Sequence, residues 1–527
     1  MKNTTQFLLY SCLSATLWSC GSKESVHVAP LQAESTYSES YQPPVFVSDE
    51  RKEKIQSIAP RLQQLIENHA RERNIPGVAY GLVVDEELLI SGSTGLINIE
   101  QNVPASTSAA FRIASMTKSF TAMAILKLME EGRLSLSDPA SRYIPEMASM
   151  RYLSKDAPAI TIENLLTMTS GFPEDNPWGD RQLDEPDQYL QDLVSEGISF
   201  SNVPAYTYEY SNTGYAMLGK IVSQVSGMSY QEYIRQHIFV PLGMEHTYWE
   251  YDRVPAGQLV IGYRWEDESW KQEPMLHDGS YGAMGGLITS IEDFSKYVGF
   301  HLSAWPPRND AENGPIRRSS VRAMQTPQFA RLNANGTNFS GKPCPQLSGY
   351  GYGLRSTEFC NGLRQVGHGG ALPGFGSNYQ FFPEYGVGLM AFGNLTYTSP
   401  WPYAEIGELL FETLALQPRQ LPVSAILAHR QAQLVEWIQQ GGQELESEIF
   451  AENFFLDRSR ENRRKDIEAM LEEAGTIREI GTMEPENQLR GSFPMEGDQE
   501  TVEVFFTLSP ESDPKIQQLV LSLLPSE

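Results

Sequence analysis

The sequence predicts an α+β fold in which helices flank an antiparallel β-sheet and a helical lobe is inserted between the strands. Three observations support this prediction. A pair of strand-like segments comes first, a long block of helical segments follows it, and further strands and a last helix close the series. Segregation of strands and helices is typical of α+β domains rather than of alternating βαβ units.

The first elements are predicted from the spacing of apolar residues. Helical spacing over residues 50–74 ends at Pro76-Gly77, and two strands are expected at 78–84 and 88–90, joined by the Asp85-Glu86 turn. Helices are then expected at residues 120–129, 161–168, 214–225 and 230–238, and at 290–300, where Ser290 and Asp293 form a capping pattern.

The later elements return to strands. Strands are expected at residues 350–354, 363–366, 378–382 and 387–392, followed by a helix at 403–414. The character of the chain then changes, and helices at 434–438 and 467–471 precede strands at 489–493, 501–508 and 516–524. We therefore expect one large domain at residues 50–415 and a small α+β C-terminal domain at 416–527.

The charge of the chain excludes one class of function. The sequence carries 40 Lys and Arg against 66 Asp and Glu, a formal net charge of −26, and contains no basic block. Such a chain repels a phosphate backbone, so no nucleic-acid partner is expected.

The N-terminus predicts export. An apolar run at residues 7–17 is too short to span a bilayer, and Leu17-Trp18-Ser19-Cys20 resembles the cleavage motif of bacterial lipoproteins, whose cysteine is lipidated. Residues 1–19 are expected to be a lipoprotein signal peptide and 20–49 a flexible tether. The protein would then face the periplasm or the cell surface, held to a membrane only through lipid on Cys20. An ordinary secretory signal with an incidental cysteine is the alternative.

The remaining cysteines predict a disulfide rather than a metal site. Cys344 and Cys360 are the pair left after export to an oxidising compartment, where such pairs are commonly bridged. They lack a C-x-x-C partner, and the 8 histidines show no metal-binding spacing. Neither a metal nor a cofactor is therefore expected.

A possible nucleophile lies at the start of the long apolar helix. Ser115 and Lys118 are three residues apart, so they share a helix face and the lysine amine can reach the serine hydroxyl. A serine becomes a good nucleophile when a neighbouring base takes its proton. Alone, the spacing is a weak signal, because it also occurs at Ser512 and Lys515 and because an N-cap serine beside a solvated lysine would produce it.

The order of three motifs makes the signal specific. Tyr210-Ser211-Asn212 and His368-Gly369-Gly370 follow Ser115-Met116-Thr117-Lys118 along the chain, whereas a Gly-x-Ser-x-Gly elbow is absent. In these motifs the sequence resembles the serine hydrolase family of class C β-lactamases, D,D-peptidases, D-aminopeptidases and related esterases. The resemblance covers about residues 50–415 and implies a β-lactamase/transpeptidase-like fold.

The resemblance implies a role for each residue of the first two motifs. Ser115 resembles the family's nucleophile, and Lys118 and Tyr210 look like the pair that moves protons to and from it. Asn212 would orient the substrate and Lys118. Without the resemblance, Tyr210 would be a core aromatic residue among neighbouring tyrosines.

The third motif would bind substrate. The backbone N–H groups of Ser115 and of Ala371, next to Gly370, look like the oxyanion hole. His368 is expected either to bind a substrate carboxylate or to be a buried structural histidine. A charge-binding histidine would lose its affinity for acidic substrates between about pH 6 and 8. The turn-rich loop at 176–181 either lines this pocket or packs on the surface.

These motifs predict a serine hydrolase that forms an acyl-enzyme on an ester, a D-amino amide or peptide, or a β-lactam-like substrate. Esterase or D-peptidase activity is favoured, because His368 stands where penicillinases of the family usually carry lysine. The alternative is a catalytically silent lipoprotein that binds peptidoglycan or penicillin as a sensor. The substrate would be a small molecule or a peptide, and the oligomeric state is not predicted.

Overall fold

The computed structural model describes residues 37–440 and 443–524. The predicted signal peptide, Cys20 and the first part of the predicted tether lie outside these residues, so the export and lipidation predictions stay predictions. The chain comprises two compact units, Met1–Tyr41 and Gln42–Glu527, and all the helices and strands described below belong to the second. Within the described ranges, no helix has the length and apolar character needed to cross a bilayer.

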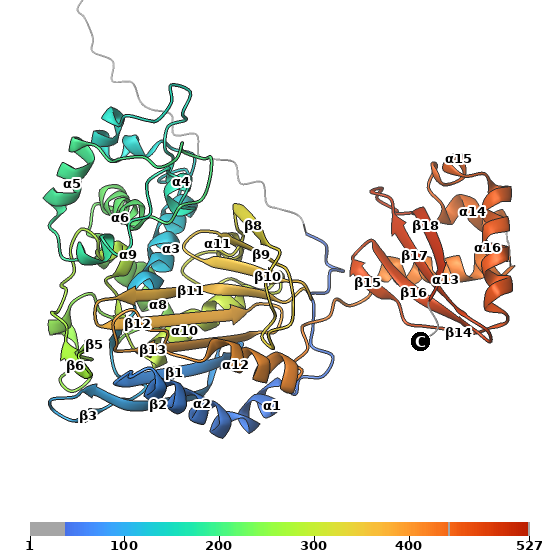
Figure 1. Ribbon diagram of the computed structural model, residues 1–527. Helices are drawn as coiled ribbons and strands as arrows, with labels where there is room; N and C mark the ends of the chain where they lie inside the picture. The colour runs from blue at the N-terminus through green and yellow to red at the C-terminus, as the bar shows by residue number, and fades with distance from the viewer. Residues whose placement is uncertain (1–36, 441–442, 525–527) are drawn as a thin grey trace, which may run out of the picture. The chain divides into compact units, whose positions relative to one another are not determined.

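A nine-stranded antiparallel sheet is the largest element of the fold (Figure 1). Its strand order is β3-β2-β1-β13-β12-β11-β10-β9-β8. The bounds are β1 (Gly77–Val84), β2 (Glu87–Asn98), β3 (Val103–Pro104), β8 (Phe329–Asn333), β9 (Gln346–Tyr350), β10 (Arg355–Phe359), β11 (Arg364–Leu372), β12 (Phe375–Phe382) and β13 (Val387–Gly393). Because β1 pairs directly with β13, the segment between β2 and β8 is an insertion into the sheet. This arrangement confirms the predicted fold class.

Helices cover the sheet and build the inserted lobe. Their bounds are α1 (Arg51–Ser57), α2 (Ala59–Glu72), α3 (Thr117–Glu130), α4 (Ile162–Leu166), α5 (Asp187–Glu196), α6 (Asn212–Ser226), α7 (Tyr230–Ile234), α8 (Val240–Leu242), α9 (Gly282–Gly285), α10 (Ile291–Ser303), α11 (Arg318–Met324) and α12 (Tyr403–Glu408). Short two-stranded ladders complete this part: β4 (Phe111–Arg112) with β7 (Ile288–Thr289), and β5 (Tyr263–Glu266) with β6 (Ser269–Gln272).

Both faces of the sheet are buried, which explains why β1 is apolar throughout. Side chains alternate along a strand, so Ala79 and Val83 belong to one core, with α3 and α10, whereas Val78 and Leu82 belong to a second core, with α2 and α12. The central helix α3 lies in the first core and is buried along most of its length. It therefore holds its N-terminal residues in a fixed place.

Two predicted boundaries are wrong. The helix predicted over residues 50–74 is divided into α1 and α2 at Ile58, because Pro60 favours a new first turn over a continued helix. The strand predicted at 350–354 is the end of β9 followed by a turn, in which Gly353 has a φ of +73°. A Cβ at Gly353 would lie 2.7 Å from Ser119 Cα, so this turn packs directly on α3 and β10 begins only afterwards.

A disulfide closes the loop that contains β9 and β10. Cys344 and Cys360 are bonded, with their Cα atoms 5.2 Å apart. The bridge connects the segment before β9 to the turn between β10 and β11.

The C-terminal residues form a second sheet with its own apolar core. Its strand order is β14-β16-β17-β18, and β15 pairs with β16. The bounds are α13 (Ala425–Gln440), α14 (Gln443–Ile449), α15 (Phe454–Asp457), α16 (Arg460–Ala474), β14 (Ile477–Ile480), β15 (Glu484–Asn487), β16 (Arg490–Gly497), β17 (Thr501–Leu508) and β18 (Ile516–Leu523). Trp437, Phe493 and Val504 belong to this core. The domain limits at residues 50 and 416 remain predictions.

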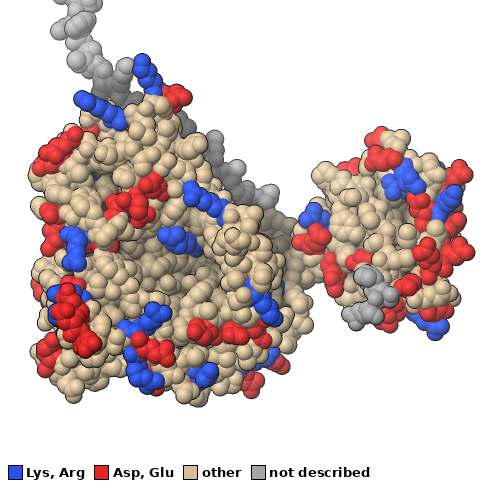
Figure 2. Space-filling view, in the orientation of Figure 1, with Lys and Arg blue, Asp and Glu red and all other residues tan. Residues whose placement is uncertain are grey.

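Acidic side chains are spread over the surface. Figure 2 shows carboxylates scattered across the face drawn, with single basic residues between them and no large basic patch. This distribution agrees with the formal net charge of −26.

Candidate active site

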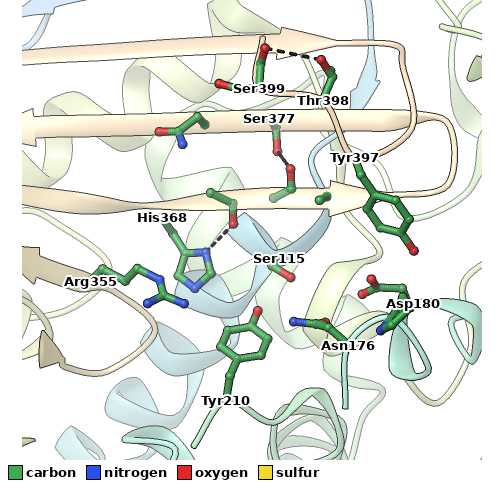
Figure 3. A pocket seen from close by; sticks show the side chains of 15 residues that line it. Ser115, Asn176, Asp180, Tyr210, Arg355, His368, Ser377, Tyr397, Thr398 and Ser399 are labelled. Atoms are coloured by element: carbon green, nitrogen blue, oxygen red, sulfur yellow. Dashed lines mark hydrogen bonds between the residues drawn. The ribbon is translucent and has the colours of Figure 1, made fainter. Parts of the chain in front are cut away.

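At least one residue of each of the three motifs lines a cavity of about 610 Å³ (Figure 3), whereas Lys118 and Asn212 are fully buried. Ser115 lies in the short 3₁₀ turn Ala114–Met116, immediately before α3. Tyr210 precedes α6, and His368 lies in β11. The cavity is lined by Ser115, Asn176, Pro177, Asp180, Tyr210, Arg355, His368, Gly369, Gly370, Ala371, Ser377, Asn378, Tyr397, Thr398 and Ser399.

Lys118 is held beside the serine by hydrogen bonds. Its Nζ donates to Ser115 Oγ at 2.9 Å, to Asn212 Oδ1 at 2.6 Å and to the carbonyl oxygen of Met284 at 3.0 Å. An ammonium has three N–H donors, so these acceptors use all of them. The side chain is fully buried, and its amine lies 5.0 Å from the centre of the Tyr210 ring. The predicted serine, lysine, tyrosine and asparagine are thus in mutual reach.

Burial decides which group can act as the base. Desolvation lowers the pKa of Lys118 to about 7, although Asp180 and Asp175 oppose this shift. Desolvation also raises the pKa of Tyr210 well above its usual range, with Ser115 opposing it. The phenol is therefore neutral near pH 7, whereas a large fraction of Lys118 is a free amine. The base nearest Ser115 is the lysine.

Asn212 is positioned by a loop that the motifs did not reveal. Asp175 accepts the backbone N–H of Asn212 at 2.7 Å and of Thr213 at 2.8 Å, and so stabilises the first turn of α6. Asn212 Nδ2 donates to Asn176 Oδ1 at 2.7 Å. The only sequence signal for these contacts was the turn-rich composition of residues 176–181, for which a surface position was equally expected. Asn176, Pro177 and Asp180 in fact line the cavity.

His368 is neutral and already fully hydrogen-bonded. Its Nδ1 donates to the carbonyl of Gly369 at 2.5 Å, so its Nε2 accepts from the hydroxyl of Tyr350 at 3.0 Å. Burial lowers the pKa of His368 well below its usual value, and the positive charges of Arg355 and Lys118 lower it further. This contradicts the expected titration between pH 6 and 8, because the imidazole carries no charge in that range.

The third motif places β11 against the turn that carries the nucleophile. A Cβ at Gly370 would overlap the carbonyl oxygen of Ile113 and the hydroxyl of Ser377. Ser377 Oγ donates to that same carbonyl at 2.7 Å. Only glycine allows this approach, which brings Ala371 to the cavity that Ser115 also lines. The N–H groups expected to form the oxyanion hole belong to these two residues.

Backbone strain is found just before the nucleophile. Ala114 is fully buried and has a φ of +51°, a left-handed conformation that costs a non-glycine residue about 1–3 kcal/mol. The surrounding packing, including the close approach of Gly370, holds it there. Such strain is common at functional sites, where it fixes the position of a reacting group.

Arg355 supplies a positive charge that the sequence did not predict. It is the first residue of β10, its side chain is exposed in the cavity, and its guanidinium lies 5.7 Å from the centre of the Tyr210 ring. Across residues 37–440 and 443–524, no salt bridge neutralises it. No motif marked this residue, because its position depends on the pairing of β10 with β11.

Comparison with known proteins identifies relatives of the larger part of the chain. The family model described as Beta-lactamase matches residues 62–410. Protein flp of Staphylococcus aureus (strain MW2) is 30% identical over 341 residues, which are 64% of this chain and 63% of that protein. Beta-lactamase-like protein 2 of Dictyostelium discoideum is 29% identical over 262 residues, 48% of this chain and 47% of that protein. The chain thus spans less than two thirds of the length of either relative.

Solved structures show the same fold. The octameric penicillin-binding protein homologue from Pyrococcus abyssi superposes with a TM-score of 0.55 at 22% identity, covering 88% of this chain and 95% of that one. The penicillin-binding protein from Bacillus halodurans gives a TM-score of 0.51 at 24% identity, covering 67% of this chain and 99% of that one. The family match shows that the chain belongs to the β-lactamase family, and the two solved structures show that it has their fold.

Proposed function

We propose that the protein hydrolyses esters or amides that carry a carboxylate, through an acyl-enzyme on Ser115. The observation that carries this proposal is the buried Lys118 amine, 2.9 Å from Ser115 Oγ and with its pKa lowered to about 7. A base of that pKa is well suited to take a proton near neutral pH.

The reaction follows from this geometry. Neutral Lys118 takes the proton of Ser115 as Oγ attacks the carbonyl carbon, and the N–H groups of Ser115 and Ala371 stabilise the oxyanion. Tyr210, a neutral phenol beside the lysine, passes the proton to the leaving alcohol or amine. Water then attacks the acyl-enzyme and gives a proton to Lys118, which returns it to Ser115 Oγ as the acyl bond breaks and the acid is released.

Arg355 supports a substrate with a carboxylate. A guanidinium presents several N–H donors in one plane and binds a carboxylate with two hydrogen bonds. Arg355 points into the cavity from β10, whereas the neutral His368 beside it has no donor left to offer. These contacts support Arg355, rather than His368, as the residue that binds the substrate carboxylate, and they support the alternative of a buried structural histidine for His368.

Esterase or D-peptidase activity is favoured over β-lactam hydrolysis, as the histidine in the third motif suggested. The binding-only alternative is less well supported, because Ser115, Lys118, Tyr210 and Asn212 are all present and in contact distance. A silent sensor would not need a lysine with a pKa near 7.

Covalent labelling tests the proposal. Intact-mass analysis after treatment with a fluorophosphonate should show one adduct, absent in Ser115→Ala. Ser512→Ala is the matched control, because Ser512 has the same spacing to Lys515 but is exposed in the C-terminal sheet region. Turnover is then measured on acyl esters, D-amino amides, acyl-D-Ala-D-Ala peptides and β-lactams. Labelling that survives in Ser115→Ala, or no turnover on any of these substrates, would contradict the proposal.

A further inference from the structure

The cavity also contains a buried carboxylate that the reaction does not use. Asp180 lies in the 3₁₀ turn Gly179–Arg181, lines the cavity and is only 3% exposed. The turn is held close to the reacting groups, since a Cβ at Gly179 would lie 2.9 Å from Cβ of Asn212. The position of Asp180 is therefore determined by the same asparagine that binds Lys118.

This carboxylate has no salt-bridge partner among the described residues, although the Tyr397 hydroxyl is hydrogen-bonded to it. Its Oδ1 is enclosed and accepts no hydrogen bond, and no salt bridge involves Asp180 within residues 37–440 and 443–524. Lys118, the nearest buried cation, already donates to three other acceptors. Burying an unpaired carboxylate is costly, so such a group indicates a missing cation.

The charged groups around Asp180 leave it ionised at neutral pH. Burial raises its pKa to about 6, while Lys118, the Tyr397 hydroxyl and Arg181 lower it and Asp175 raises it. Above this pH the side chain is an anion at the wall of the cavity. Figure 3 shows it beside Tyr397, with Ser115 between this side of the cavity and Arg355.

We propose that Asp180 binds a positively charged amino group of the substrate. An ammonium has three N–H donors, and two further acceptors lie in the same wall: the Tyr397 hydroxyl and Asn176 Oδ1, which has a lone pair left after accepting from Asn212. The favoured substrates are thus amino acid amides, esters or short peptides with a free amino group. This inference rests on the proposed function and narrows its substrate class.

With Arg355, the site has one charge of each sign on the two sides of Ser115. A short peptide with a free amino group and a free carboxylate has a positive charge at one end and a negative charge at the other, with its amide bonds between them. Charges of opposite sign at fixed places also determine the direction in which a substrate enters, because the reversed orientation places like charges together.

The test compares substrates that differ only in the charge of the amino group. The full-length protein is assayed with alanine p-nitroanilide and N-acetylalanine p-nitroanilide, as both enantiomers, and with p-nitrophenyl acetate as a neutral ester. We expect kcat/KM of the free amine to exceed that of its N-acetyl derivative by about 10- to 100-fold, mainly through KM, as for a charge-assisted hydrogen bond.

Substitutions identify the residue responsible. Asp180→Asn should bring that ratio close to one, because a neutral amide cannot pair with the ammonium group. Asp184→Asn removes an exposed carboxylate from the same segment and should leave the ratio unchanged.

Three results would overturn parts of this scheme. A wild-type ratio at or below one contradicts the ammonium site while leaving the hydrolase intact. An equal loss on all three substrates in Asp180→Asn shows that Asp180 supports Lys118 or the fold instead. Absence of both ester turnover and Ser115 labelling in the wild type overturns the proposed function, and the ammonium site with it.

Discussion

The proposed chemistry depends on Lys118, because burial of this side chain, and not the ordinary pKa of a lysine, determines whether its amine is charged. An exposed lysine is cationic at pH 7 and cannot accept a proton. Desolvation lowers its pKa to about 7, whereas the hydrogen bonds to Asn212 and to the Met284 carbonyl hold its amine against Ser115. The burial of Lys118 in the first turn of α3 thus both fixes the position of its amine and lowers its pKa.

This predicts a pH profile. The active form has a deprotonated Lys118, so kcat/KM for a neutral ester should rise about tenfold per pH unit below pH 7 and level off above it. Lys118→Ala should lose about 10²- to 10⁴-fold in kcat. Steady-state kinetics from pH 5 to 9 measure both. Lys127→Ala, on the same helix, is the control, and a profile that keeps rising past pH 9 would exclude Lys118 as the base.

A second prediction concerns Arg355. Arg355→Gln should raise KM for a substrate with a free carboxylate by about 10- to 100-fold and leave its methyl ester unaffected, because only the acid forms charge-assisted hydrogen bonds. In the wild type, neither Arg355 nor His368 should itself change charge between pH 6 and 8, since the pKa of Arg355 is raised and that of His368 lies well below this range.

The comparison variant is Arg331→Gln, which removes an exposed arginine that bonds Thr207. Equal KM changes for acid and ester in Arg355→Gln would show that the arginine has a packing role.

At the scale of secondary-structure elements, the site depends on how closely β11 approaches the turn before α3. The strained Ala114, the glycine of the third motif and the Ser377 hydroxyl all meet at the Ile113 carbonyl. This contact joins the central sheet to the turn before α3, and it brings Ala371 to the cavity that Ser115 also lines. Small displacements here are expected to affect catalysis more than folding.

Gly370→Ala tests this contact. The added methyl group overlaps the Ile113 carbonyl and must move β11, and a displacement near 1 Å can cost about 10²-fold in rate. We therefore expect kcat to fall about 100-fold for a neutral ester while circular dichroism stays near that of the wild type. Gly214→Ala in α6 is the control, because its Cβ would come no closer than 3.7 Å to its neighbours Leu165 and Ser211, which is ordinary van der Waals contact. Full activity of Gly370→Ala would contradict the argument.

At the scale of the whole molecule, the functional parts are separated along the chain. The cavity is built from segments between Ala114 and Ser399, whereas the C-terminal sheet has an independent core. The N-terminal residues, which lie outside those described, carry the predicted lipidation motif.

Lipidation gives the prediction at this scale. Cys20→Ala, expressed in a bacterial host, should move the protein from the membrane to the soluble fraction, because one substitution removes the only predicted anchor. Cell fractionation with immunoblotting measures the change. Serine hydrolase labelling of the soluble variant serves as the control for folding, and a variant that stays with the membrane would contradict the anchor.

Local patterns in the sequence predicted the α+β class and a candidate serine–lysine pair, and the family resemblance was needed to give that pair a role. Apolar spacing located α3, β12 and β13 to within a few residues, because a helix or strand that buries one face carries apolar residues at regular intervals along the sequence. Ser115 and Lys118 were also predictable, since a helix turn alone brings them together. The partners Tyr210 and Asn212 needed the order of the motifs as well.

Only the tertiary structure decided the charges of the site and its recognition of substrate. The pKa of Lys118 and the neutrality of His368 depend on burial among residues far away in sequence, for which no local pattern exists. The Met284 carbonyl that accepts a hydrogen bond from the lysine is a backbone group, which every residue has, so no residue type in the sequence predicts this contact. Arg355 and Asp180 enter the cavity because strand pairing and a loop packed on Asn212 place them there. The sequence therefore determined the candidate reacting residues, and the fold determined which charges surround them.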